Sequence, residues 1–170
     1  GKNAEPFLGV VLTYSSEDAA PEMNNLTASY SFPKNSGMDT VKRKNDIVRL
    51  GVLGAGNFAT AVMLPALKKT EYIELVGILS GSGLSAVHAA QKFGFHYAAE
   101  SIDQILNDPG INTIAILTRH DLHAEQVVAA LQAGKHVFVE KPLAINKAQL
   151  AIIGDQLSAA KDQLLTVGFN

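Results

Sequence analysis

From residue 46 onward, short apolar runs alternate with longer segments in which apolar residues have helical spacing. Short runs of this kind are typical of buried strands, and the longer segments are typical of amphipathic helices. Strands separated by helices need crossover connections, which produce a parallel sheet covered on both faces. Because such crossovers are right-handed, few topologies remain. We therefore expect an α/β fold with a doubly wound parallel sheet in three layers, αβα.

The expected elements follow from these runs. Strands are predicted at 48–53, 73–79, 96–98, 113–117, 137–140 and 164–167, and helices at 58–69, 84–93, 101–107, 121–133 and 146–160. Pro65 predicts a kink in the first helix. Ser101 and Asp121 are expected to begin the third and fourth helices as N-caps, and Gly134 is expected to end the fourth.

Residues 1–45 differ in composition from the rest of the chain. They contain one apolar, β-prone run, Phe7–Tyr14, followed by a stretch rich in Ser, Asn, Thr, Pro and Asp. A total of 170 residues fits one domain with an appendage. We expect residues 46–170 to form the domain and residues 1–45 to be a linker or the tail of a preceding domain. The Phe7–Tyr14 run could be an edge strand of either domain or part of a poorly ordered arm.

Composition and charge exclude several classes of function. Fourteen Lys and Arg residues against sixteen Asp and Glu give a formal net charge of −2, so the chain has no general attraction for nucleic acid or anionic membranes. Cysteine is absent, which excludes disulfides, thiolate catalysis and thiolate metal sites. No apolar run approaches the roughly 18 residues that span a bilayer. We expect a soluble, cytoplasmic protein without nucleic-acid or membrane partners and leave a homo-oligomer open.

The motif G-x-G-x-x-A, at residues 54–59, lies between the first predicted strand and helix. In this setting Gly54 permits a tight turn, Gly56 lets a pyrophosphate approach the backbone, and Ala59 lets the helix pack closely on the strand. The free N–H groups of the helix N-terminus would face the phosphates. We predict a Rossmann dinucleotide site that includes Asn57 and Phe58; the alternative is a turn of small residues that binds nothing.

The residues after the second predicted strand bear on the choice of cofactor. An acidic residue about 20 positions beyond the glycines normally binds the ribose 2′-hydroxyl of NAD. This chain has Ser80 and the small residues 81–83 there, without a carboxylate. The site therefore favours NADP over NAD, although no Arg or Lys follows in the loop to neutralise a 2′-phosphate.

Two further groups of polar residues follow predicted strands. Glu140 and Lys141 come after the fifth main strand, and the carboxyl ends of parallel strands face the ligand crevice. Lys141 could move a proton at a substrate oxygen, with Glu140 as its partner. The alternative is an exposed ion pair of little consequence.

The second group follows the fourth main strand. We expect Thr118, Arg119 and His120 to line the cofactor, Asp121 to cap the helix, and His123 to face the nicotinamide side of the crevice. The two histidines are three residues apart, but no third ligand completes a metal site. We therefore predict no metal.

These motifs together resemble the Gfo/Idh/MocA family of glucose-fructose oxidoreductases and inositol dehydrogenases. The matching segments are 52–59, 122–125, 133–143 and 167–170, and the specific part runs from Ala133-Gly134-Lys135-His136 to Glu140-Lys141-Pro142. The resemblance implies that Lys141 contacts substrate and assists proton transfer while hydride moves to or from the nicotinamide. It also implies a cis peptide before Pro142.

The chain departs from the family pattern in two respects. Thr118-Arg119-His120 stands where the family often has Pro-Asn or Thr-Asn, which leaves the ribose or adenine contacts open. Nothing corresponds to the family's C-terminal substrate domain. The N-terminal arm resembles proteins in which this module follows a zinc-type alcohol dehydrogenase domain. We therefore expect a fragment that binds cofactor but is inactive alone.

The expected function is that of the NAD(P)-binding domain of an oxidoreductase acting on a sugar, polyol or related hydroxyl compound. The alternative is a non-catalytic NAD(P)-binding or redox-sensing module on the same fold. A nucleotide-sugar or methyl-donor enzyme is disfavoured because the Glu140-Lys141-Pro142 motif has no evident role in one.

Overall fold

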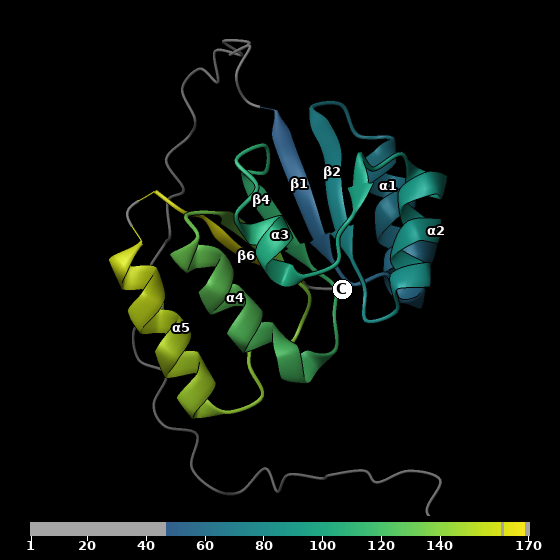
Figure 1. The fold of residues 1–170 in the computed structure, drawn as a ribbon. Helices are drawn as coiled ribbons and strands as arrows, with labels where there is room; N and C mark the ends of the chain where they lie inside the picture. The colour runs from purple at the N-terminus through teal and green to yellow at the C-terminus, as the bar shows by residue number, and fades with distance from the viewer. Residues whose placement is uncertain (1–46, 161, 169–170) are drawn as a thin grey trace, which may run out of the picture. The chain divides into compact units, whose positions relative to one another are not determined.

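Six parallel strands form one sheet in the order β3-β2-β1-β4-β5-β6 (Figure 1). The computed structural model describes residues 47–160 and 162–168, so the expectations for residues 1–45 lie outside the described residues. The strands are β1 Val48–Leu53, β2 Ile73–Leu79, β3 Tyr97–Ala98, β4 Thr113–Ile116, β5 His136–Val139 and β6 Leu165–Val167. The strand order is that of a doubly wound dinucleotide-binding sheet, with its switch point between β1 and β4.

The helices cover both faces of this sheet. They are α1 Leu64–Lys68, α2 Gly83–Phe93, α3 Ile102–Leu106, α4 His123–Gln132 and α5 Lys147–Ala159, with a π-helical segment η1 at Ala59–Met63 and a 3₁₀ turn η2 at His120–Leu122. Helices α1 and α2 lie on one face, and α3, α4 and α5 lie on the other (Figure 1). The expected three-layer αβα fold is confirmed.

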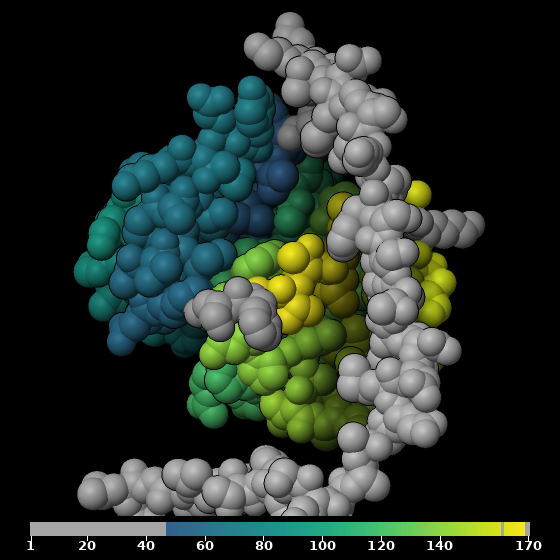
Figure 2. All heavy atoms as spheres, turned by 180° about the vertical axis from the view of Figure 1, so that it is seen from behind, coloured from purple at the N-terminus to yellow at the C-terminus, as the bar shows by residue number. Residues whose placement is uncertain are grey.

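Two apolar clusters join these layers. One packs β1, β4 and β5 against α3, α4 and α5, with Ile105, Ile114, Val127 and Ile153 almost completely buried. The other packs β1 and β2 against η1, α1 and α2. Seen from behind, the blue and teal half of the described chain, with α1 and α2, and the green to yellow half, with β6, occupy opposite sides of this face (Figure 2). The two faces of the sheet therefore have separate helical covers.

Two of the four predicted helix signals, those at Ser101 and Gly134, are confirmed, and the kink at Pro65 stays a prediction. The π-helical segment comes just before Pro65, whose missing N–H interrupts regular helical bonding. Ser101 accepts a hydrogen bond from the Gln104 N–H, and Gly134 has a φ of 73° just beyond α4. The expected cap at Asp121 is wrong. The chain first makes the 3₁₀ turn η2, and the Asp121 carboxylate instead lies 3.4 Å from Nε of Arg119.

At the amino end of the sheet, Lys135 holds together the loop between α3 and β4. Its side chain is buried and donates to the backbone oxygens of Asp108 and Ile111, at 2.8 and 2.7 Å. Burial lowers the pKa of this ammonium group, against the opposing effect of the Asp108 carboxylate. Tyr97 donates to the same carboxylate at 2.7 Å. These residues form a polar network at the amino end of the sheet, whereas the glycine turn lies at the carboxyl end.

No helix among residues 47–160 and 162–168 is long and apolar enough to cross a membrane.

Candidate dinucleotide-binding site

The turn after β1 begins at Gly54, where the backbone has a left-handed φ of 109°. Its N–H donates to the Leu79 carbonyl at 2.8 Å, which ties the turn to the end of β2. A Cβ at this position would lie 2.5 Å from the backbone oxygen of Leu117. Gly54 is therefore required by both its backbone conformation and the close passage of the chain after β4.

Gly56 has a different setting within the same turn. A Cβ built there meets no protein atom within 4 Å, so the protein's own packing does not require a glycine. Gly56, Asn57 and Phe58 are exposed, whereas Ala59 is buried against the sheet. This leaves open space above backbone N–H groups at the start of a helix, which suits the approach of a pyrophosphate.

A cavity of about 240 Å³ adjoins this turn at the carboxyl edge of the sheet. The chain segments that follow β1, β4 and β5 contribute its lining, which consists of Phe58, Leu117, Thr118, His120, Glu140 and Lys141. Backbone hydrogen bonds from Leu117 to Leu53 and from Glu140 to Ile116 hold these segments in register. The topology thus brings together residues that are more than eighty positions apart in the sequence.

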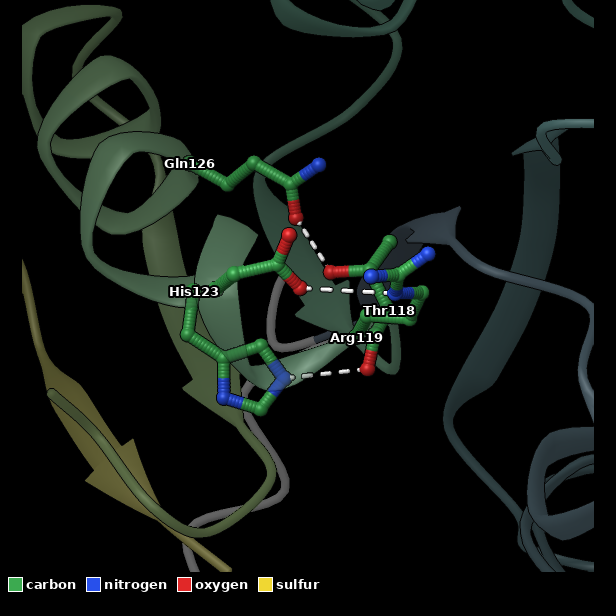
Figure 3. A network of polar contacts seen from close by, with 5 residues as sticks. Thr118, Arg119, His123 and Gln126 are labelled. Atoms are coloured by element: carbon green, nitrogen blue, oxygen red, sulfur yellow. Dashed lines mark hydrogen bonds and ion pairs between the residues drawn. The ribbon is translucent and has the colours of Figure 1, made fainter. Parts of the chain in front are cut away.

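The hydroxyl group of Thr118 forms a hydrogen bond with a residue of α4. The Thr118 Oγ1 donates to Oε1 of Gln126 at 2.6 Å, and Nε2 of His123 lies 3.1 Å from the Thr118 carbonyl oxygen (Figure 3). With its proton engaged, the hydroxyl of Thr118 offers lone pairs to the cavity. It is suited to accept a hydrogen bond from a ribose hydroxyl or an amide N–H.

His123 lies elsewhere than expected. Its side chain is completely buried, and its Nδ1 lies 2.8 Å from the carbonyl oxygen of Pro142. The expectation that His123 faces the nicotinamide side of the crevice is wrong, because both ring nitrogens point to backbone oxygens within the protein. His120, by contrast, is exposed and lines the cavity, with the two rings edge to face at 5.6 Å.

Arg119 points away from this arrangement. Its side chain is 86% exposed and pairs with Asp121 at 3.4 Å, a contact worth little in water. It is not among the residues that line the cavity. A cofactor contact by Arg119 stays a prediction.

Glu140 and Lys141 both reach the cavity, but they do not form the expected side-chain pair. The Glu140 carboxylate accepts a weak hydrogen bond, at 3.3 Å, from the backbone N–H of Lys141. Its other oxygen lies 2.7 Å from the position that a Cβ of Gly168 would take, so Gly168 makes room for the carboxylate. The Lys141 side chain is exposed at the cavity, and the peptide between Lys141 and Pro142 is cis, as the family resemblance implied.

Ser80 follows β2 and is half-buried beside the glycine turn, outside the cavity lining. Among the hydrogen bonds of the described residues, none uses its hydroxyl group. The hydroxyl is therefore available to a ligand at the position where a ribose 2′ substituent is recognised in this fold.

A larger hollow, of about 470 Å³, lies between α4 and α5. Its lining is apolar apart from Glu125 and the amides of Gln132 and Gln149, so it brings together no set of groups that could act on a substrate. Within residues 47–160 and 162–168, no group of three or more His, Asp or Glu residues is placed to hold a metal ion. The chemistry-bearing side chains single out the smaller cavity at the carboxyl edge.

Comparison with known proteins supports the same assignment. Residues 48–169 match the profile of GFO_IDH_MocA, described as an oxidoreductase family with an NAD-binding Rossmann fold. The chain belongs to this family. The Gfo/Idh/MocA match begins at the first residue of β1 and includes the glycine turn and the Glu140-Lys141-Pro142 motif.

Two similar structures and one relative illustrate the match. A 1,5-anhydro-D-fructose reductase from Ensifer adhaerens is 31% identical over 122 residues, which cover 72% of this chain and 35% of that protein. A 3-ketoreductase from Actinomadura kijaniata in complex with NADP has a TM-score of 0.67 at 30% identity and covers 72% of this chain and 38% of its own.

The third is the biliverdin reductase of Synechocystis in complex with biliverdin and NADP⁺, with a TM-score of 0.64 at 32% identity over 71% of this chain and 37% of its own. The present chain spans about one third of the length of the curated relatives that it matches.

Sequence reasoning missed two functional contributions, those of Gln126 and of the Pro142 carbonyl. Gln126 lies one helical turn after His123, so the spacing places both on one face of α4. No local pattern shows that this face meets the ends of β4 and β5, because that contact depends on the folded chain.

Proposed function

We propose that this domain binds NADP or NAD at the carboxyl edge of the sheet and serves a reversible hydride transfer on a hydroxyl or keto group of a sugar-like substrate. The observation that carries the proposal is the placement of Lys141 in the same cavity edge as the glycine turn, at the switch point of the sheet. Membership in an NAD-binding oxidoreductase family supports it.

The residues of the turn fit a dinucleotide. Open space over Gly56 accommodates phosphate oxygens, and the helix that follows supplies N–H groups. Thr118 offers hydroxyl lone pairs, while Phe58 and Leu117 supply apolar surface for a ring. When bound, the nicotinamide would supply the hydride acceptor or donor.

The role proposed for Lys141 concerns the proton. In oxidation of a CH–OH group, the hydride leaves carbon and the hydroxyl proton must leave oxygen, and Lys141 Nζ takes up that proton as the carbonyl forms. In reduction, the ammonium form of Lys141 gives the proton to the carbonyl oxygen. Glu140, which is half-buried beside Lys141, would hold the backbone of this segment through its hydrogen bond to the Lys141 N–H.

NADP is the preferred cofactor in this proposal. Residues 80–83 contain no carboxylate that would repel a 2′-phosphate. The free hydroxyl of Ser80 can donate a hydrogen bond to such a phosphate. The Actinomadura and Synechocystis structures named above contain NADP or NADP⁺.

Calorimetric titration of the 170-residue chain with NADPH and with NADH tests the proposal directly. We expect saturable binding of both, with the tighter dissociation constant for NADPH. Absence of binding for both at millimolar concentration would refute the cofactor site, and tighter binding of NADH would refute the preference.

A non-catalytic NAD(P)-sensing module is the second candidate. The glycine turn alone can bind the cofactor, so binding does not by itself show that Lys141 takes part in a reaction. The two candidates differ in what removal of the Lys141 side chain does to the reaction rate.

We further propose that the domain works within a longer protein, with a C-terminal substrate domain and a preceding zinc-type alcohol dehydrogenase domain. The relatives, which are about three times the length of the matched segment, support additional chain beyond this module. The β-prone run at 7–14 supports a preceding domain. A cytoplasmic location and a homo-oligomer belong to the same proposal, and mass measurement of the longer protein in solution tests the oligomer.

A further inference from the structure

His123 is the one histidine of the described chain whose side chain has no exposed surface. It is the first residue of α4, and its ring lies between two segments that line the cavity. Nδ1 lies 2.8 Å from the Pro142 carbonyl oxygen, and Nε2 lies 3.1 Å from the Thr118 carbonyl oxygen. Figure 3 shows the ring of His123 pointing towards the backbone of Thr118.

These contacts connect the two sides of the cavity. Thr118 follows β4, whereas Pro142 is the residue next to Lys141 after β5. The segment from Lys141 to Ile145 has no helix or strand of its own. The hydrogen bond from His123 to the Pro142 carbonyl is therefore a restraint on the residue directly after Lys141.

We propose that His123 is a positioning residue, which fixes the place of Lys141 relative to the bound nicotinamide by donating from Nδ1 to the Pro142 carbonyl. This inference rests on the proposed function, because it assigns a purpose to the location of Lys141. A carbonyl oxygen accepts only, so the shorter contact requires a proton on Nδ1. In the neutral tautomer with its proton on Nδ1, Nε2 carries no proton, so the longer contact to the Thr118 carbonyl is not a hydrogen bond in that form.

Two amide substitutions separate these contacts. The side-chain nitrogen of Asn takes approximately the place of Nδ1, and that of Gln takes approximately the place of Nε2. His123→Asn can therefore still donate to Pro142, whereas His123→Gln can donate only towards Thr118. His123→Leu donates to neither, and His88→Gln, at an exposed position of α2, is the matched control.

The binding experiment uses the 170-residue chain and two ligands. NADPH occupies both halves of the site, and 2′,5′-ADP occupies only the adenosine half. We expect His123→Gln and His123→Leu to weaken NADPH about tenfold, as loss of a hydrogen bond would. His123→Asn should weaken it about threefold or less. The affinity for 2′,5′-ADP should stay within about twofold of the unsubstituted chain in all variants.

Hydrogen exchange followed by mass spectrometry provides a readout without cofactor. The backbone amides of residues 141 and 143–145 should exchange faster in His123→Gln and His123→Leu than in His123→Asn, with residues 48–58 unchanged in all. Equal exchange at residues 141–145 in all three variants and the unsubstituted chain would overturn the proposal. Equal loss of NADPH and 2′,5′-ADP binding in step with a lower melting temperature would also overturn it, since that pattern indicates a general loss of stability.

The two proposals fail differently. If the unsubstituted chain binds neither NADPH nor NADH but exchange at 141–145 follows the expected order, the proposed function fails and the restraint by His123 stands. If NADPH binds and the exchange order is absent, the site stands and the role of His123 fails.

Discussion

Gly54 and Gly56 are two residues apart in one turn, but the protein constrains them for different reasons. Gly54 has a left-handed backbone and lies against the backbone of Leu117, which cannot move without displacing the chain after β4. Gly56 faces open space and has no such neighbour. The first glycine is a requirement of folding, whereas we propose that the second is a requirement of ligand access.

Alanine substitutions should separate these requirements. Gly54→Ala should lower the free energy of unfolding by about 3 kcal/mol, from strain and backbone overlap. Gly56→Ala should change it by less than about 1 kcal/mol and weaken NADPH at least tenfold, because a methyl group occupies the phosphate space. Gly154→Ala, in an open position of α5, is the control and should leave binding unchanged. Denaturant unfolding and calorimetry measure both quantities, and normal NADPH affinity in Gly56→Ala would contradict the assignment.

A second residue-scale prediction concerns Ser80. Ser80→Ala removes a hydroxyl group that has no partner among the described residues and should weaken NADPH by about three- to tenfold, with NADH changed by less than twofold. Parallel titrations measure the ratio of the two affinities. Equal losses for both cofactors would show that Ser80 does not recognise the 2′-phosphate.

At the scale of elements, the strands and helices could be predicted largely from sequence, because their apolar spacing reports directly which faces are buried. The β-strand ends at Leu53 and Leu79, for example, agree with the predicted runs. The start of α4 could not be predicted in the same way. Asp121 has the residue type of an N-cap, but its pairing with Arg119 and the 3₁₀ turn depend on the local backbone path.

The site was predictable to a similar extent. Motif spacing located Gly54, Gly56 and Lys141, because their chemistry depends on the strand ends where they lie. Motif spacing did not reveal the burial of His123. Its two partners are backbone oxygens, which every residue has, so no pattern of side chains identifies them.

Tyr97 in β3 provides a prediction at this scale. Burial, together with the hydrogen bond to Asp108, raises the pKa of the Tyr97 phenol above its usual 10.0. Above pH 10 the unfolded chain releases this proton while the folded chain retains it, so the free energy of unfolding falls as pH rises. Tyr97→Phe should be about 1 kcal/mol less stable at pH 7 and less sensitive to alkali.

Thermal unfolding between pH 7 and pH 11 tests this expectation. Burial lowers the pKa of Lys135, so the unfolded chain holds this proton more tightly than the folded chain. The contribution of Lys135 to the free energy of unfolding therefore rises with pH, opposite in sign to that of Tyr97. Both proteins retain Lys135, so the difference between their pH profiles isolates Tyr97. Parallel profiles above pH 10 would contradict the assigned cause.

For the whole molecule, the cavity is a property of the sheet topology. The residues that line it follow three different strands, and the switch between β1 and β4 brings those strand ends together. The cofactor site that we propose therefore depends on this edge of the sheet.

Lys141→Ala in that longer protein tests whether the module is catalytic. We expect kcat on an accepted sugar or polyol to fall by about 10²-fold or more, as loss of a general acid or base does, while the melting temperature stays unchanged because Lys141 is exposed. Steady-state kinetics with saturating cofactor measure the effect. An unchanged rate would favour the non-catalytic NAD(P)-sensing module.

The two ends of the sheet contain different groups of residues. The buried Lys135 and its carbonyl partners lie at the amino end, and the glycine turn and Lys141 lie at the carboxyl end. A directed-evolution library confined to the amino-end loop should accordingly change thermal tolerance without retuning cofactor choice, and a library at residues 80–83 should do the reverse. The parallel arrangement of strands thus gives a protein engineer two independently adjustable regions within one small domain.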